Sequence, residues 1–265
     1  MNYIEFDELN DKTESTMAEP HSHDYYELFF LLKDSRTVFI NDKTFILPES
    51  SLVVVPPFSM HKTQGGPYKR ININISVDML KKHEEHFLKE LAAFYAIRIP
   101  SEENYLIRSL LEEGALITKT NSKSKKDYLL AITSTILYLL KKQKIIPVST
   151  LDAFAVKQPN DHIVYNVIHY INDNYQKEIF LEQIAKHFFI SKSTLCALFK
   201  ERMNCTVMEY VLRLRIAKAK YLLLYTNKSI ENISYECGFS SANYFGLVFK
   251  KEIGLSPLNY KKKRL

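Results

Sequence analysis

The chain has 265 residues, 46% of them hydrophobic and 25% charged, so it has room for about two globular domains and is neither collagen-like nor low in complexity. No window approaches the roughly 18 apolar residues of a membrane span, the N-terminus lacks the apolar core of a signal peptide, and the three cysteines show no disulfide pattern, so we expect a cytoplasmic protein without membrane contact. The net charge of +6 lies in one half: residues 161–265 carry 16 Lys and Arg against 9 Asp and Glu, and such a one-sided positive field favours a polyanionic partner.

Residues 18–77 predict a small β-barrel. Short runs rich in aromatic and β-branched residues alternate with polar turns, which is typical of strands. In residues 70–76 isoleucine alternates with asparagine, so one face of that strand is expected to be buried and the other polar. The other runs are 26–32, 36–40, 43–47 and 51–55.

The segment HSHDYYE opens this region and places two histidines and a glutamate on the entry to a strand, with a further histidine downstream. Alternation along a strand puts His21 and His23 on one face, and imidazoles with a carboxylate suit Fe, Mn, Ni or Zn. The pattern resembles the cupin barrel, in which such residues hold a metal. The second half of the cupin pattern departs here, since Phe58 and Gly65 stand where glycine and asparagine are usual. We therefore expect no metal, and instead a pocket for a small-molecule effector, with polar groups from His21, His23, Tyr25, Glu27 and His61.

Residues 78–144 change to a helical period. Asp78 is the expected N-cap of the first helix, and residues 125–144 are apolar over much of their circumference. Such a helix is buried within its own domain or against a second copy of the chain, and both possibilities are open. We expect residues 1–150 to form a cupin-like sensing and dimerisation domain, followed by a linker at 151–160 and a helical domain at 161–265.

The C-terminal half repeats itself, because residues 188–210 match residues 238–263 in the order of their apolar and basic positions. Each copy predicts a short helix, a tight turn and an amphipathic helix, at about 181–203 and 230–253, which is the helix-turn-helix pattern. Between the copies, residues 206–224 predict one continuous helix about 28 Å long. A helix of that length would hold the second helices of the two copies near one turn of B-DNA apart, about 34 Å.

Gly238 is expected at a turn with positive φ, and Ser191 and either Ser240 or Ser241 are expected N-caps. This doubled pattern, over residues 162–263, resembles the DNA-binding domain of the AraC/XylS family of bacterial transcription regulators. In the first copy the likeness rests on Ala185, Ser191, Leu195, Phe199, Lys200, Tyr210, Arg215, Ala219, Leu222 and Leu223. In the second it rests on Ile233, Cys237, Gly238, Phe239, Ser240, Tyr244, Phe245, Val248, Phe249, Lys250, Lys251, Gly254, Ser256, Pro257 and Tyr260.

The resemblance implies which side chains contact DNA. The base-contacting positions it implies are Ser193, Cys196, Ala197, Asn243, Gly246 and Leu247. Only Asn243 is of a type that makes paired hydrogen bonds to a base, in this case adenine, so we expect an A·T-rich site read partly through DNA shape. The expected phosphate contacts are Lys192, Thr194, Lys200, Arg215, Ser241, Tyr244, Lys250 and the basic tail 261–264.

The sequence thus predicts an α+β protein with an N-terminal cupin-like barrel, flanking helices and an all-helical C-terminal domain. Its expected function is regulation of a bacterial operon, as a homodimer that binds double-stranded promoter DNA and RNA polymerase, without enzymatic activity or cofactor. Two alternatives stay open. One is a metal-dependent cupin enzyme fused to a DNA-binding domain, and the other is a ligand-independent activator whose barrel only dimerises.

Overall fold

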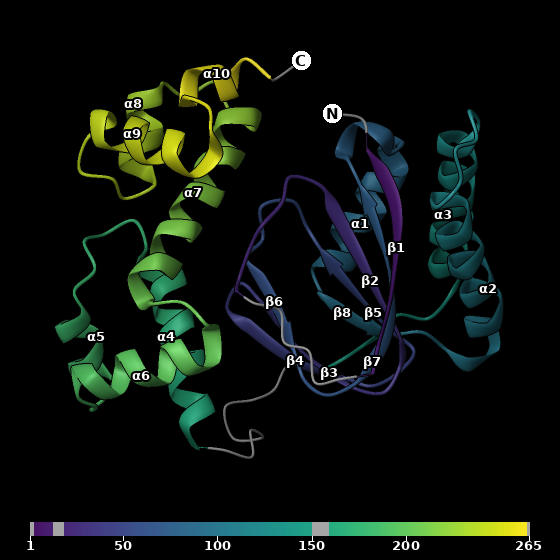
Figure 1. The fold of residues 1–265 in the computed structure, drawn as a ribbon, viewed down its shortest axis with the longest axis horizontal. Helices are drawn as coiled ribbons and strands as arrows, with labels where there is room; N and C mark the ends of the chain where they lie inside the picture. The colour runs from purple at the N-terminus through teal and green to yellow at the C-terminus, as the bar shows by residue number, and fades with distance from the viewer. Residues whose placement is uncertain (1–2, 13–18, 150–158, 264–265) are drawn as a thin grey trace.

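The computed structural model describes residues 3–12, 19–149 and 159–263. An N-terminal part of antiparallel strands and helices is followed by a C-terminal part of helices (Figure 1), which confirms the α+β class. In these three stretches, no helix combines the length and the apolar content needed to cross a membrane.

The N-terminal strands form two facing sheets. They are β1 (Ile4–Asp11), β2 (Tyr26–Lys33), β3 (Arg36–Ile40), β4 (Lys43–Leu47), β5 (Ser51–Val55), β6 (His61–Gln64), β7 (Tyr68–Ile75), β8 (Ala96–Arg98) and β9 (Ile146–Pro147). One sheet has the order β1-β7-β2-β5-β8-β9 and the other β4-β3-β6. The five predicted runs all become strands. The described strands do not close into the predicted barrel, because the short strands β3, β4 and β6 pair only among themselves.

Strand β2 shows how the layers are built. Leu28 and Phe30 point from it into a core shared with helices, whereas Phe29 and Leu31 point into a core between the two sheets. Side chains alternate between the faces of a strand, so a strand covered on both sides is apolar throughout. The large sheet is therefore the middle layer of the N-terminal part.

Strand β1 lies outside the predicted range of 18–77. It pairs with β7 along its whole length, from Ile4 opposite Ile75 to Asp11 opposite Tyr68. Among its residues only Phe6 is fully buried, and the rest are partly exposed as expected of an edge strand. The acidic, half-exposed sequence therefore gives little sign of a strand before its partner β7 is known.

Three helices cover the outer face of the large sheet: α1 (Lys82–Ala92), α2 (Ser101–Thr118) and α3 (Lys125–Lys142). The predicted N-cap at Asp78 is wrong, because residues Val77–Met79 form a 3-10 turn and α1 begins only after Lys81. Helix α3 buries one face in the N-terminal core and leaves Tyr128 and Tyr138 exposed. One side of the helix is therefore buried within its own domain, and packing against a second copy of the chain stays a prediction.

The C-terminal helices are α4 (Pro159–Asn174), α5 (Leu181–His187), α6 (Lys192–Met203), α7 (Val207–Tyr225), α8 (Ile230–Glu236), α9 (Ala242–Ile253) and α10 (Pro257–Lys261). Helix α4 begins inside the predicted linker, and residues 150–158 lie outside the described stretches. The helices form two hydrophobic clusters: α4, α5 and α6 make the first, and α8, α9 and α10 the second. Helix α7 contributes to both.

The two parts of the chain touch each other along β6 and α7. Met60, only 2% exposed, belongs to the first C-terminal cluster, and Lys62 Nζ donates to the backbone oxygen of Arg202 at 2.6 Å. Nearby, Arg213 of α7 forms an ion pair with Glu19. The contacts come from residues close in sequence to His21 and His61, two of the three histidines expected in the ligand pocket.

We expect Gly114→Ala to lower the free energy of unfolding by about 1–3 kcal/mol, because α2 packs so closely on β1 that a Cβ at Gly114 would lie 2.3 Å from Cδ1 of Phe6. Gly246→Ala in α9 is the matched control, since a Cβ there has no neighbour within 4 Å and alanine favours a helix by up to about 1 kcal/mol. Urea denaturation followed by circular dichroism measures both. Equal stability of the two variants would contradict this packing of α2 on β1.

Candidate nucleic-acid interface and ligand pocket

The first repeat is a helix, a tight turn and a second helix, α5 and α6. The Ser191 hydroxyl accepts a hydrogen bond from the backbone N–H of Thr194 at 3.0 Å, as predicted, and so begins α6. Phe189 holds the turn at φ 55° with its side chain 95% exposed. Leu195 and Phe199 are buried, while the predicted base-contacting side chains of this helix, Ser193, Cys196 and Ala197, are exposed.

The second repeat, α8 and α9, has the same design. Gly238 adopts φ 82°, as predicted, and a Cβ there would lie 2.5 Å from the backbone oxygen of Tyr175. Ser241 rather than Ser240 is the N-cap of α9. Phe245 and Phe249 are buried, and of the predicted base-contacting residues Asn243 and Leu247 are exposed and Gly246 is partly exposed.

Helix α7 joins the two units and is continuous over 19 residues, about 28 Å. Its first half packs Val211 and Leu214 into the first cluster, and its second half packs Ala219 and Leu223 into the second. In the second half of the helix, Tyr221 is 48% exposed and its ring lies against that of Phe58 in the N-terminal part. The buried face of α7 turns around the helix axis along its length, so this one helix contributes side chains to both hydrophobic clusters.

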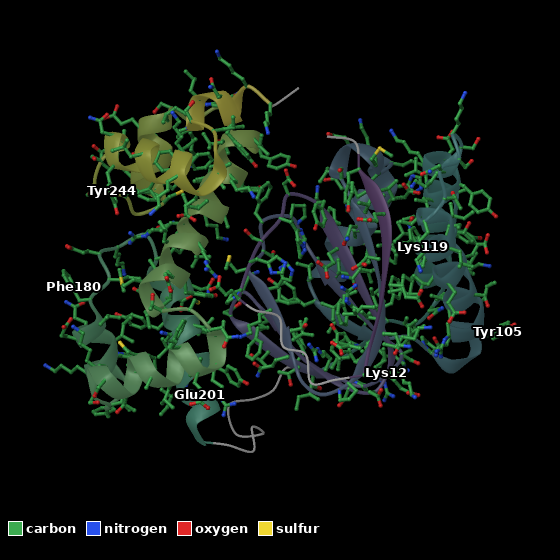
Figure 2. All side chains as sticks on the ribbon, in the orientation of Figure 1. Lys12, Tyr105, Lys119, Phe180, Glu201 and Tyr244 are labelled. Carbon is green, nitrogen blue, oxygen red and sulfur yellow. The ribbon has the colours of Figure 1, made fainter. Side chains whose placement is uncertain are left out.

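The predicted phosphate contacts differ in how free their donors are. Lys200 and Lys250 are exposed, and Tyr244 is 53% exposed on the surface of the second unit (Figure 2). Lys192 pairs with Glu182 at 2.6 Å. Thr194 and Ser241 sit in the first turns of α6 and α9, where backbone N–H groups face outward.

Arg215 has a structural role that the sequence did not indicate. Its Nε donates to the backbone oxygen of Tyr175 and its Nη2 to that of Lys177, both at 2.8 Å. It therefore braces α7 against the segment that follows α4, and its guanidinium lies 5.9 Å from the ring centroid of Phe239. Two of its guanidinium donors are thus engaged by backbone oxygens, and a phosphate contact by Arg215 stays a prediction.

A cavity of about 390 Å³ lies between β1, β2, β6 and β7. Its lining is mainly polar and includes Asp7, His21, Tyr25, Glu27, Arg70, Asn72 and Asn74. The side-chain oxygens of both asparagines are buried without a hydrogen-bond partner. The alternation of residues 70–76 correctly predicts a polar face there, but the part of the wall supplied by β1 was missed with that strand.

The predicted pocket residues meet beside this cavity. The Nε2 atoms of His23 and His61 lie 3.0 and 3.5 Å from the same oxygen, Oε2 of Glu27. His21 pairs with His61 through an isolated backbone bridge, and the ring of Tyr25 stacks on His23 with centroids 3.9 Å apart. One potential ligand atom from each of the three histidines lies within 4.8 Å of the others. All five residues named from the sequence are therefore neighbours in space.

The electrostatics of this cluster are set by burial and by proximity. Burial, with smaller effects from His61 and His23, lowers the pKa of His21 to about 4. Burial also lowers the pKa of His23, against the effect of its contact with Glu27. Burial alone would raise the pKa of Glu27, but the adjacent His23 and His61 outweigh it and hold the pKa of that carboxyl well below its usual range. These shifts favour an ionised Glu27 beside uncharged imidazoles of His21 and His23.

Imidazole nitrogens and a carboxylate oxygen are a donor set that divalent transition metals accept. Two observations fit a metal here: Nε2 of His61 is buried without a hydrogen-bond partner, and Asn72 donates to Oε1 of Glu27 at 2.6 Å, which leaves Oε2 facing the histidines. The residues present are thus compatible with a bound ion.

Comparison with known proteins agrees with this arrangement. A family model for a helix-turn-helix domain matches residues 184–263. The uncharacterized HTH-type transcriptional regulator YdeC of Bacillus subtilis (strain 168) is 24% identical over 249 residues, 91% of this chain and 85% of that protein. The HTH-type transcriptional activator RhaS of Mannheimia succiniciproducens is 40% identical over 91 residues, 34% of each chain. A solved transcriptional regulator with an AraC-type DNA-binding domain from Chromobacterium violaceum is 26% identical and covers 40% of this chain and 95% of that one, with a TM-score of 0.38.

The relatives named above are transcriptional regulators rather than enzymes. The match at residues 184–263 covers most of both repeats, and the likeness to YdeC extends over the N-terminal part as well. Residues 184–263 thus match a helix-turn-helix domain, and over most of its length the chain is similar to an HTH-type transcriptional regulator.

Proposed function

We propose that the chain is a sequence-specific regulator of a bacterial operon, with two helix-turn-helix motifs that enter successive major grooves of one duplex. The observation that carries this proposal is the shared helix α7, which supports two like units whose second helices, α6 and α9, leave their outer faces exposed. The helix is about 28 Å long, close to the roughly 34 Å of one DNA turn. Selection of binding duplexes from a random-sequence library with the full chain tests it, and enrichment of no sequence would refute it.

Within this proposal, α6 and α9 contact bases unequally. Asn243 is the residue suited to paired hydrogen bonds with adenine, whereas Leu247, 73% exposed, suits contact with a thymine methyl. The other proposed contacts are Ser193, Cys196, Ala197 and Gly246, whose small side chains allow close approach of the backbone. The enriched site should accordingly be rich in A·T pairs.

The proposed phosphate contacts are Lys192, Thr194, Lys200, Ser241, Tyr244 and Lys250, joined by Lys261, Lys262 and Lys263 near the end of the chain. Lys192 must break its ion pair with Glu182 before it can contact a phosphate. The cost is small because the pair is exposed. These contacts give affinity without sequence preference and make binding sensitive to salt.

We further propose that residues 1–150 form a cupin-like sensing domain whose cavity takes a small-molecule effector. Support comes from the cavity's polar lining, with buried asparagine oxygens that lack partners. A domain that served only for dimerisation would be expected to fill that space with apolar side chains. The effector would act by binding one arrangement of the two domains better than another, which shifts their populations.

The outer face of α2 and α3 is the proposed dimer contact. Tyr105 is 82% exposed and Leu116 is 60% exposed, and their spacing of eleven residues places them on one side of α2. The two helices lie on the far side of the large sheet from the C-terminal helices, with Tyr105 at the outer edge (Figures 1 and 2). A second copy docked there would leave both DNA-binding units accessible to promoter DNA and to RNA polymerase. The proposed location of this complex is the bacterial cytoplasm.

Asn243→Ala should reduce discrimination between the selected duplex and a random one by about 1–3 kcal/mol, since it removes the paired contact to adenine. Asn259→Ala, an exposed asparagine of α10, is the matched control. Fluorescence anisotropy with both duplexes measures the change. A loss of affinity that is equal for the two duplexes would contradict a base contact at Asn243.

Lys250→Ala should weaken binding to both duplexes alike and reduce the slope of log affinity against log salt by about one, because one phosphate contact is lost. Lys126→Ala, an exposed lysine at the start of α3, should leave the slope unchanged. The slope is obtained from titrations at several salt concentrations. An unchanged slope for Lys250→Ala would remove it from the interface.

Tyr105→Lys combined with Leu116→Lys should convert a wild-type dimer to a monomer, because two charges would be buried at the centre of the contact. Sedimentation velocity gives the oligomeric state. Tyr235→Lys, a similarly exposed tyrosine on α8, should remain dimeric. A wild-type chain that is monomeric, or a double variant that stays dimeric, would exclude this face.

A further inference from the structure

Strand β6 carries a lysine that is completely buried. Lys62 is 0% exposed, and its Nζ donates to the backbone oxygen of Arg202 at 2.6 Å. Lysine is almost never fully buried without a partner, because removing its ammonium group from water is costly. Burial lowers the pKa of Lys62 to about 8, so the group still carries its charge at neutral pH. The contact therefore brings a charged donor from the N-terminal part into the C-terminal part.

The acceptor of this hydrogen bond lies at the end of the proposed DNA-contacting helix of the first unit. Arg202 is the last residue but one of α6. The last four carbonyl groups of a helix have no partner within it, and the helix dipole makes this end negative. The backbone N–H of Asn204 donates to the oxygen of Lys200, and Lys62 donates to that of Arg202. The C-terminal cap of α6 is thus shared between its own backbone and a side chain 140 residues away.

A second contact beside Lys62 supports the same helix. Met60 is buried in the cluster that also holds Phe199 and Met203 of α6. Its backbone is tied to the turn between β3 and β4, because the backbone N–H of Asn41 donates to the oxygen of Met60 at 2.7 Å and the N–H of Met60 donates to Oδ1 of Asn41 at 3.0 Å. The start of β6 and this turn therefore form one edge that packs against the first unit.

The second unit is held differently. Within the described stretches, no hydrogen bond or ion pair links α9 to the N-terminal part. The ring of Phe58 lies 6.1 Å from those of Tyr221 and Tyr225, but both of these residues belong to α7. A change at Lys62 should accordingly disturb α6 more than α9.

We propose that Lys62 is a positioning residue for DNA recognition by the first unit, because its buried ammonium group fixes the end of α6 and so orients the exposed side chains of Ser193, Cys196 and Ala197. A helix is stiff, so a displacement of its last turn also tilts its first turns. The inference rests on the proposed function. It gives the N-terminal part a direct role in reading one of the two grooves.

The first test uses the full chain without DNA. Lys62→Met keeps an unbranched apolar side chain but removes the donor. In hydrogen exchange followed by mass spectrometry, we expect the amides of residues 198–204 in this variant to exchange about threefold faster or more than in wild type, and those of residues 247–253 to be unchanged. Lys33→Met, exposed at the end of β2, and Gly114→Ala, which loosens the N-terminal part away from α6, should leave both segments unchanged.

The second test measures base discrimination along the selected duplex. Duplexes that each carry one changed base pair are compared by fluorescence anisotropy, and the pairs affected by Asn243→Ala mark the half that α9 contacts. We expect Lys62→Met to reduce discrimination about threefold or more at pairs in the other half, and to leave the α9 half as in wild type. Gly114→Ala, which lowers stability alone, should leave both halves as in wild type.

The role of Lys62 is overturned if exchange of residues 198–204 is unchanged or rises equally in both segments, or if discrimination falls equally in both halves. Should Lys62→Met not fold, as judged by circular dichroism, Asn41→Gly replaces it with the same expected and contradicting results. Glycine keeps the φ of 53° at that turn and removes only the acceptor for Met60. A chain that selects no duplex refutes the proposed function, whereas the exchange experiment decides on Lys62 without DNA.

Discussion

The continuity of helix α7 is the constraint on which the rest of the C-terminal half depends. Two small helical units could not hold a fixed separation if a flexible loop joined them. Here the first half of α7 buries Leu214 in one core and the second half buries Leu223 in the other, so the rod cannot turn without disturbing both. The rigid spacing of the two exposed helices follows from this shared burial.

In the N-terminal half, a single strand likewise contacts two different parts of the structure through its two faces. A strand sends alternate side chains to opposite sides, so β6 places His61 beside Glu27, a residue of the cavity wall, and Lys62 against Arg202. The cavity and the DNA-binding half are therefore separated by the thickness of a single strand. Communication over so short a distance needs only a small displacement of one segment.

Much of this protein follows from its sequence. The matching positions of the two repeats, Leu195 with Phe245 and Phe199 with Phe249, fix which helix faces are buried, and the sequence therefore also indicates which faces are free for DNA. Local chemistry places Ser191 and Ser241 at helix starts and Gly238 in a turn, because these depend on bonds to near neighbours. The pattern of His21, His23, Glu27 and His61 likewise predicts a shared site.

Other features were decided only by contacts between distant segments. Strand β1 has too few buried residues to be recognised before it pairs with β7, and Arg215 becomes a brace only because the backbone after α4 comes within reach of its guanidinium. The sequence determined the local elements and their apolar faces, since these depend on periodicity and on neighbours along the chain. The tertiary structure decided that two imidazoles meet one carboxylate oxygen, and that the strand bearing one of them touches the DNA-binding half, because both depend on packing between residues far apart in the chain.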